Sequence, residues 1–206
     1  NECTQPVTDA KYVMGPFGFL KQAWILGMWG AFRKGPGGML PLNALSFLKT
    51  DPSLDLPDIQ MHFLSVLLQD HGAKLPDSHC FSNHICQLRP ESRGYIAIKS
   101  LDSRVPPIIQ PNYFAEQKDR EVMIEGVKMS RDIISQKAFD EYRGKEITPG
   151  IEVQTDEQIE NFIREKAETI YHPVGTCKMG SDEYAVVDDK LRVRGVENLR
   201  VVDASI

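Results

Sequence analysis

The chain has 206 residues, of which 41% are hydrophobic and 26% are charged, a balance typical of a folded protein that excludes general disorder. The 24 basic and 29 acidic residues leave a formal charge of −5, without a long run of one sign. A nucleic-acid partner is therefore not expected, because binding to a phosphate backbone requires a basic surface.

The four cysteines are too few to form a disulfide scaffold in a chain of this length, so we expect a reducing compartment and an intracellular, cytoplasmic location. The sequence opens at Asn1 without a visible secretory signal and stops at Ile206 within a strand-to-helix passage. These features predict a fragment of a longer polypeptide.

The first predicted element is an apolar helix over residues 17–32, in which Trp24, Met28 and Phe32 recur at helical spacing. Polar residues and glycines interrupt it, and it is too short to span a bilayer. We expect a buried or half-buried helix. The alternative is a helix that lines a tunnel or lies on a membrane surface, since tryptophans and the basic residues 33–34 suit an interface; this would give peripheral membrane association.

Residues 58–64 alternate apolar and polar side chains, which predicts a half-buried strand. A second strand is expected at residues 93–100, entered through Gly94. Apolar residues then recur at helical spacing after Asp119, which we expect to cap that helix.

Thr155 and Gln158 fit a capping box at the start of a further helix, which Pro173 should end near His172. Two short strands are expected within residues 191–202. Strands mixed with helices that do not alternate regularly favour an α+β fold over a doubly wound sheet.

His172 is the first candidate for chemistry, because an imidazole can accept and release a proton near neutral pH. Pro173 fixes the backbone after it, and Gly175 allows a flat ligand to approach closely. This pattern predicts a catalytic proton acceptor; the alternative is a structural histidine on a buried loop.

Asp203 ends an apolar segment and precedes the small residues Ala204 and Ser205, which allow a cofactor to approach a strand end. The alternative is an aspartate that caps a following helix, and the two roles are compatible.

A group of potential metal ligands suggests a function of another class, a binding or regulatory module. Its spacing is too tight and irregular for a usual zinc motif, so no metal is expected. Hydrolase and nucleotide-hydrolysing functions have no support, because the Gly-x-Ser-x-Gly, His-Glu-x-x-His and P-loop motifs are absent. The group consists of His79, Cys80, His84 and Cys86.

Residues 171–180 read Tyr-His-Pro-Val-Gly-Thr-Cys-Lys-Met-Gly, and residues 195–205 read Gly-Val-Glu-Asn-Leu-Arg-Val-Val-Asp-Ala-Ser. Together with residues 89–94, 111–114 and 139–157, they resemble the C-terminal part of the glucose-methanol-choline (GMC) oxidoreductase family. The resemblance covers essentially the whole chain and is strongest toward the choline dehydrogenase and medium-chain alcohol dehydrogenase branch.

The resemblance implies an FAD-dependent enzyme that oxidises a primary alcohol to an aldehyde by hydride transfer to flavin N5. A quinone or another acceptor would then reoxidise the flavin, and the sequence leaves oxidase and dehydrogenase both open. The family histidine that matches His172 is the proton acceptor, and Asp203, Ala204, Pro173 and Val174 match positions beside the flavin. The competing hypothesis is a flavin-free module built on the Cys/His group.

The implied fold is an antiparallel-sheet substrate domain with flanking helices, plus the C-terminal strands of an FAD-binding domain. Residues 1–88 match the first part of the substrate domain with a linker, and residues 89–206 match the C-terminal domain. The flavin-facing part of the latter would be residues 171–206. The chain alone is not expected to hold FAD, because it lacks a Gly-x-Gly-x-x-Gly fingerprint and the second catalytic residue would follow Ile206.

The substrate remains to be assigned from the pocket residues, for which His62 and His84 are the candidates. The residues by which choline-specific members recognise trimethylammonium have no clear counterpart here. Arg89 falls in one of these regions and would repel a cation, which favours a neutral aliphatic or aromatic alcohol.

Overall fold

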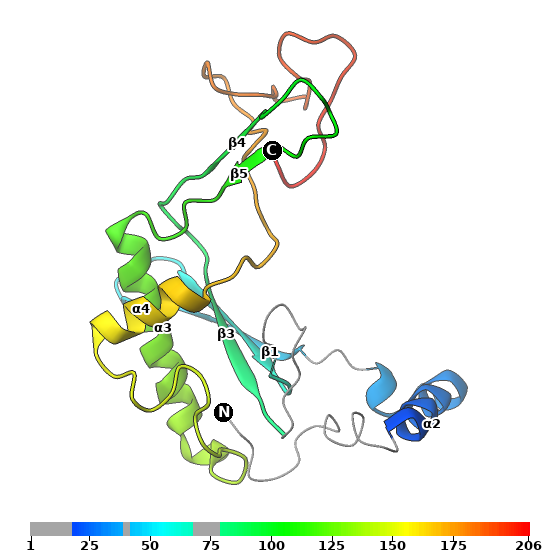
Figure 1. The fold of residues 1–206 in the computed structure, drawn as a ribbon, viewed down its shortest axis with the longest axis vertical. Coiled ribbons are helices and arrows are strands. Elements are labelled where there is room, and N and C mark those ends of the chain that lie inside the picture. The colour runs from blue at the N-terminus through cyan, green and yellow to red at the C-terminus, as the bar shows by residue number, and fades with distance from the viewer. Residues whose placement is uncertain (1–17, 39–41, 68–78) are drawn as a thin grey trace. The chain divides into compact units, whose positions relative to one another are not determined.

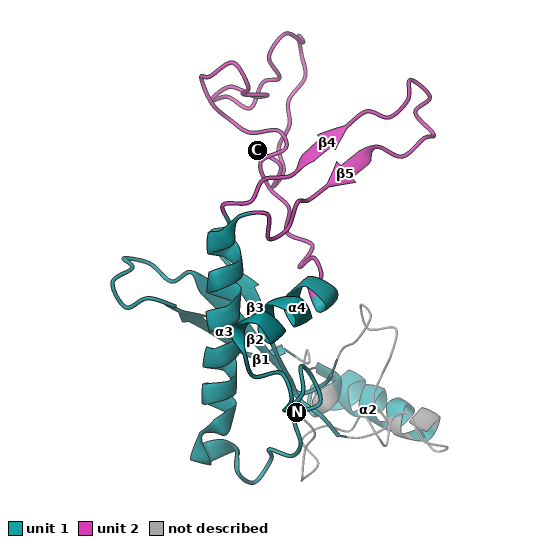
Figure 2. Ribbon diagram, turned by 60° about the vertical axis from the view of Figure 1, so that its left-hand side comes forward, with its two compact units in different colours: residues 1–90, 116–166 teal, residues 91–115, 167–206 magenta. Residues whose placement is uncertain are grey.

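A computed structural model of the chain describes residues 18–38, 42–67 and 79–206 (Figure 1). The fold is α+β, as predicted, and divides into two compact units. The first unit comprises residues up to 90 and 116–166, and the second comprises residues 91–115 and 167–206 (Figure 2).

A three-stranded antiparallel sheet forms the centre of the first unit, with the strand order β1-β2-β3. Strand β1 spans Leu42–Leu48, β2 spans Ile59–Leu64 and β3 spans Ser82–Gln87. The strand predicted at residues 58–64 is thus confirmed, and its alternating pattern places Ile59 and Met61 in the core.

Helix α3, Gln117–Ser135, covers one face of this sheet (Figure 2). The helix approaches so closely at Gly126 that a Cβ there would lie 2.9 Å from Cγ2 of Ile85 on β3. The apolar cluster between helix and sheet consists of Ile59, Met61 and Val122, with Leu48, Ile85, Met123, Met129 and Ile133 packed against them.

The start of α3 differs from the prediction that Asp119 caps the helix. Glu116 is the N-cap residue, and Asp119 lies inside the helix with only 1% of its surface exposed. Its Oδ1 accepts a hydrogen bond of 2.9 Å from Nε2 of Gln87 on β3. The carboxylate therefore joins the helix to the sheet, since a buried charge requires a polar partner.

Helix α4, Asp156–Lys166, follows the short turn η3, Lys137–Phe139, and packs on α3. The predicted capping box is confirmed in both directions. The Gln158 N–H donates to Thr155 Oγ1 over 3.2 Å, and the Thr155 N–H donates to Gln158 Oε1 over 2.9 Å.

Helix α2, Gly18–Phe32, confirms the predicted apolar helix, but its expected burial is not found. Trp24 is 58% exposed, because the described contacts of α2 are with the adjoining turn η1, Pro36–Gly38. The guanidinium of Arg33 lies 4.5 Å from the ring centre of Trp29. Among the helices that the structure describes, none is long and apolar enough to cross a membrane.

The second unit contains an antiparallel hairpin of β4, Tyr95–Ala97, and β5, Ile108–Gln110. Strand β4 confirms the strand predicted at residues 93–100, although it is shorter. Ile96 and Ile109 face each other across the hairpin and are 54% and 66% exposed. One side of the hairpin is therefore an uncovered apolar surface.

The prediction of two strands within residues 191–202 is wrong. The backbone there forms only isolated bridges, between residues 187 and 193 and between residues 192 and 200. Leu191, at the start of the first stretch, has a positive φ of 64°, and Asn198, with a φ of 61°, turns the chain just before the second.

Candidate functional site

The loop that carries His172 starts earlier than predicted. Helix α4 ends at Lys166, and residues 167–170 form no regular secondary structure. Thr169 Oγ1 instead accepts a hydrogen bond of 3.0 Å from the Tyr171 N–H, and Tyr171 has a positive φ of 63°.

His172 is exposed, in contrast to the alternative of a histidine on a buried loop. Its imidazole makes no hydrogen bond or ion pair with any residue that the structure describes. Pro173 and Val174 are exposed beside it, and Gly175 adopts a φ of 84° that favours glycine. The side chain is therefore open to a ligand.

The far end of this loop is tied to the end of the chain. The Cys177 N–H donates a hydrogen bond of 2.6 Å to the Ser205 carbonyl oxygen. The next residue, Lys178, accepts hydrogen bonds from the N–H groups of Val186 and Val187 over 3.0 and 3.3 Å. The structure thus brings the His172 loop and the Asp203 segment together, although about thirty residues separate them in sequence.

Asp203 is exposed and fixed by its neighbour Ser205. Its Oδ1 accepts the Ser205 N–H over 2.8 Å and the Ser205 hydroxyl over 2.5 Å. These hydrogen bonds, the hydroxyl first, lower the pKa of Asp203 below its ordinary value. The Ile206 N–H donates to the Asp203 carbonyl over 3.4 Å, so Asp203 adopts the capping geometry of the alternative interpretation.

His62 and His84 lie directly opposite each other on β2 and β3, and Leu45 on β1 pairs with His62 in the same row. Alternation places this row on the sheet face opposite α3, here called the open face. His84 is exposed, whereas Nδ1 of His62 is buried without a partner among the described residues. With Leu45 at 51% and Phe47 at 55% exposure, the open face combines two imidazoles with an apolar surface.

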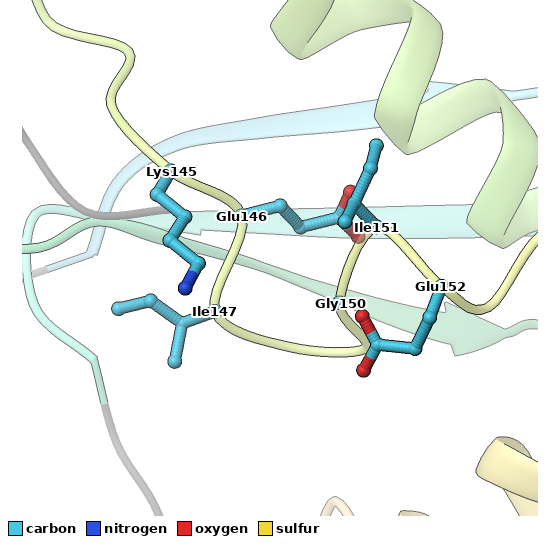
Figure 3. Close-up of a pocket in the computed structure, with 6 residues that line it drawn as sticks. All are labelled: Lys145, Glu146, Ile147, Gly150, Ile151 and Glu152. Carbon is cyan, nitrogen blue, oxygen red and sulfur yellow. The ribbon is translucent and has the colours of Figure 1, made fainter.

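The two histidines belong to the first unit, whereas the other predicted site residues belong to the second. A surface hollow of about 270 Å³ in the first unit contains none of them (Figure 3). It is lined by Lys145, Glu146, Ile147, Gly150, Ile151 and Glu152.

The hypothesis of a Cys/His metal cluster is wrong. In the ranges that the structure describes, no three potential metal ligands come together. Cys80 is buried with 1% exposure while His84 faces outward, and burial raises the pKa of the Cys86 thiol, which disfavours the thiolate that zinc binds.

Arg89, expected from the sequence to disfavour a cationic substrate, is held by the backbone of the first unit. Its guanidinium donates to the carbonyl oxygen of Pro57, and the adjacent Leu88 N–H donates to the Asp58 carbonyl over 2.8 Å. Arg89 thus fastens the connection that enters β2. Because the Pro57 carbonyl is a neutral acceptor, the guanidinium keeps its charge, and the expectation of a neutral alcohol stays a prediction.

Sequence reasoning missed Ser205 as a contributor to the site. Its hydroxyl and N–H bind Asp203, and its carbonyl binds Cys177. The Asp-x-Ser spacing is the signal that could have found it, because an aspartate side chain often binds the backbone two residues later.

Comparison with known proteins assigns the chain to a family. A sequence model of the GMC oxidoreductase family matches residues 90–206, more than half of the chain. The chain therefore belongs to the GMC oxidoreductase family.

Curated relatives extend the match to the whole chain. The oxygen-dependent choline dehydrogenase of Pseudomonas fluorescens (strain Pf0-1) is 43% identical over 204 residues, 99% of this chain and 35% of that protein. The protein of the same name from Brucella ovis is 42% identical over 207 residues, 100% of this chain and 37% of that protein. The chain thus spans about a third of the length of these relatives.

Solved structures show the same fold. The pyridoxine 4-oxidase from Mesorbium loti is 30% identical, with a TM-score of 0.71 over 79% of this chain and 32% of that chain. A formate oxidase from Aspergillus oryzae RIB40 covers 100% of this chain and 40% of its own, with a TM-score of 0.85. The latter is 24% identical, so it supports the fold alone.

Proposed function

We propose that this chain is part of an FAD-dependent enzyme that oxidises a primary alcohol to an aldehyde. The hydrogen bond between Cys177 and Ser205 carries the proposal, because it joins the exposed His172 to the Asp203 segment in a GMC oxidoreductase. A proton acceptor on a loop that is linked to a cofactor-binding segment is an arrangement that alcohol oxidation can use.

The residues assigned to the cofactor fit a flavin. Pro173, Val174 and Ala204 are exposed, and a Cβ on Gly175 would meet nothing within 4 Å, so a planar ring can approach the loop. Oδ2 of Asp203 has no hydrogen bond to a described residue and can accept one from a ligand hydroxyl. When bound, FAD supplies an electron-deficient ring that takes up hydride at N5.

The step assigned to His172 is removal of the alcohol O–H proton. A ring nitrogen is available for this, because the imidazole is exposed and has no partner among the described residues. Loss of the proton raises the electron density on oxygen and favours departure of hydride from the adjacent carbon. A positioned base contributes about 10²–10⁴-fold in rate.

The open face of the sheet is proposed to contact the substrate. His62 and His84 can form hydrogen bonds with it, while Leu45 and Phe47 offer apolar contact. Choline is the first substrate to test, because the curated relatives carry its name. Neutral aliphatic and aromatic alcohols are the next.

We assign residues 1–88 to the first part of a substrate domain and residues 89–206 to the C-terminal domain, with 171–206 facing the flavin. A quinone or oxygen is proposed as the electron acceptor, and the protein is expected inside the cell. Peroxide release and quinone reduction, measured side by side, distinguish the acceptors.

The purified complete enzyme tests the function directly. Its visible spectrum should show oxidised flavin, and anaerobic addition of the right alcohol should bleach it and yield the aldehyde. A protein without flavin, or a flavin that choline, aliphatic and benzylic alcohols all leave oxidised, would refute the proposal.

A further inference from the structure

We propose that Ser205 is a positioning residue that fixes the His172 loop relative to the Asp203 carboxylate. Ser205 is half-buried, while Asp203 and Ala204 before it are exposed. Its N–H and hydroxyl both bind Asp203 Oδ1, and its carbonyl receives the Cys177 N–H at 2.6 Å. One residue therefore connects a carboxylate to a distant loop.

The loop depends on this connection because little else holds it. From residue 172 to residue 176 every side chain is exposed, and no hydrogen bond joins these residues to another described residue. The anchors lie at the two ends, Tyr171 on Thr169 and Cys177 on Ser205. Loss of the hydrogen bond at either end of the loop is therefore expected to displace His172.

The hydroxyl of Ser205 stabilises the turn that presents its carbonyl to Cys177. With both N–H and hydroxyl on one oxygen of Asp203, the turn from Asp203 to Ser205 is held closed, and the Ile206 N–H of the following peptide group donates to the Asp203 carbonyl over 3.4 Å. Loss of the hydroxyl leaves one of these two contacts and allows the carbonyl to turn away from Cys177. This role rests on the proposed function, since a displacement of about 1 Å at a catalytic base can cost up to about 100-fold in rate.

The test is Ser205→Ala in the FAD-loaded enzyme, read by hydrogen exchange of the peptide that contains the Cys177 amide and by anaerobic flavin reduction. Loss of one hydrogen bond should speed exchange there about tenfold. The limiting rate of flavin reduction should fall about tenfold, with the alcohol concentration for half-maximal rate changed less than about twofold. The FAD content should stay at the parent level.

Two variants serve as controls. Ser205→Thr keeps the hydroxyl and should restore both readouts. Ser135→Ala removes a hydroxyl that donates to the Asp132 carbonyl over 2.7 Å at the end of α3, and should change neither. If Ser205→Ala does not fold, Ser205→Cys takes its place, since a thiol of similar size is a weaker donor and should give the same changes in smaller measure.

Parent-level exchange at Cys177 in Ser205→Ala would overturn the proposal, as would slower reduction caused only by loss of FAD. Because exchange does not depend on turnover, it also separates this inference from the proposed function. Faster exchange in a protein whose flavin no alcohol reduces would uphold the connection through Ser205 and reject the enzymatic role of His172.

Discussion

At the residue scale, His172 and Asp203 differ in how they are held. The His172 imidazole is exposed and has no partner among the described residues, whereas the Asp203 carboxylate is fixed by two groups of Ser205. A proton acceptor must remain open to its substrate, while a group that orients a cofactor gains from rigidity. Substitution of His172 should therefore affect the rate before it affects cofactor content.

Replacement of His172 by Ala in the complete enzyme should slow flavin reduction about 10²–10⁴-fold, because the alcohol proton then lacks a positioned acceptor. Anaerobic stopped-flow measures this rate, and the visible spectrum checks that FAD is retained. Added imidazole should restore part of the rate if the missing group is the base. An unchanged rate would remove His172 from the mechanism.

The lowered pKa of Asp188 predicts how the stability of the protein changes in acid. Hydrogen bonds from the Arg192 side chain, followed by those from backbone N–H groups, lower the pKa of Asp188 from 3.8 to about 2. A carboxyl group with a depressed folded pKa stabilises above its unfolded pKa, and this contribution is lost as the pH falls through the folded value. The window for Asp188 therefore runs from about pH 4 down to about pH 2.

Hydrogen exchange of the Lys190 and Arg192 amides, both bound to Asp188 Oδ1 at 2.9 Å, reads this loss locally. After correction for intrinsic rates, their protection should fall across that window in the parent protein. Asp188→Asn should show weaker protection above about pH 4 and no fall below it. Equal pH dependence in both proteins would contradict the role of the Asp188 charge.

At the element scale, the contact of α3 with the sheet depends on the missing side chain at Gly126. A Cβ there would lie 2.9 Å from Ile85 Cγ2 and 3.2 Å from Ile59 Cδ1, closer than packed atoms tolerate. We expect Gly126→Ala to destabilise the protein by about 1–3 kcal/mol. This steric cost exceeds the stabilisation that the higher helix propensity of alanine provides. Denaturant titration measures this change.

The matched control lies on the solvent side of the same helix. Lys118 is exposed, and Lys118→Ala should alter the free energy of unfolding by less than about 0.5 kcal/mol. If both variants behave alike, the close approach of α3 is not the cause of the effect.

The elements predicted correctly from sequence are those whose signals are local. The alternation in β2 and the reciprocal bonds of Thr155 and Gln158 need no distant partner. Predictions failed where the role of a residue depends on a contact with a residue distant in sequence. Asp119 looks like a cap, but its partner Gln87 lies on β3.

The candidate site was predictable in part for the same reason. The sequence motifs point to His172 and Asp203, but the bond between Cys177 and Ser205 that joins their segments depends on the tertiary fold. The engagement of Arg89 with Pro57 is likewise invisible in the sequence. The position of the Arg89 charge is therefore set by a contact that the sequence does not reveal.

At the scale of the whole molecule, apolar surface remains uncovered in each unit. Phe47 is 55% exposed on the open face, and Ile109 is 66% exposed on the β4–β5 hairpin. The chain spans 35% of the length of its Pseudomonas fluorescens relative, so polypeptide that this chain does not supply is proposed to cover the hairpin and to enclose the substrate against the open face. The proposed flavin contacts, on one exposed loop and one turn, are too few to hold FAD alone.

We therefore expect the 206-residue chain, produced by itself, to be colourless and to bind a hydrophobic dye strongly. Leu45→Ser combined with Phe47→Ser should reduce dye fluorescence, because it removes apolar surface from the open face, whereas Lys49→Ser on the neighbouring exposed position should not. In the complete enzyme the same double substitution should weaken activity, because Leu45 and Phe47 are proposed to contact the substrate. If the isolated chain bound one equivalent of FAD, the cofactor would need no further polypeptide. The proposal that missing polypeptide helps to hold FAD would then be rejected.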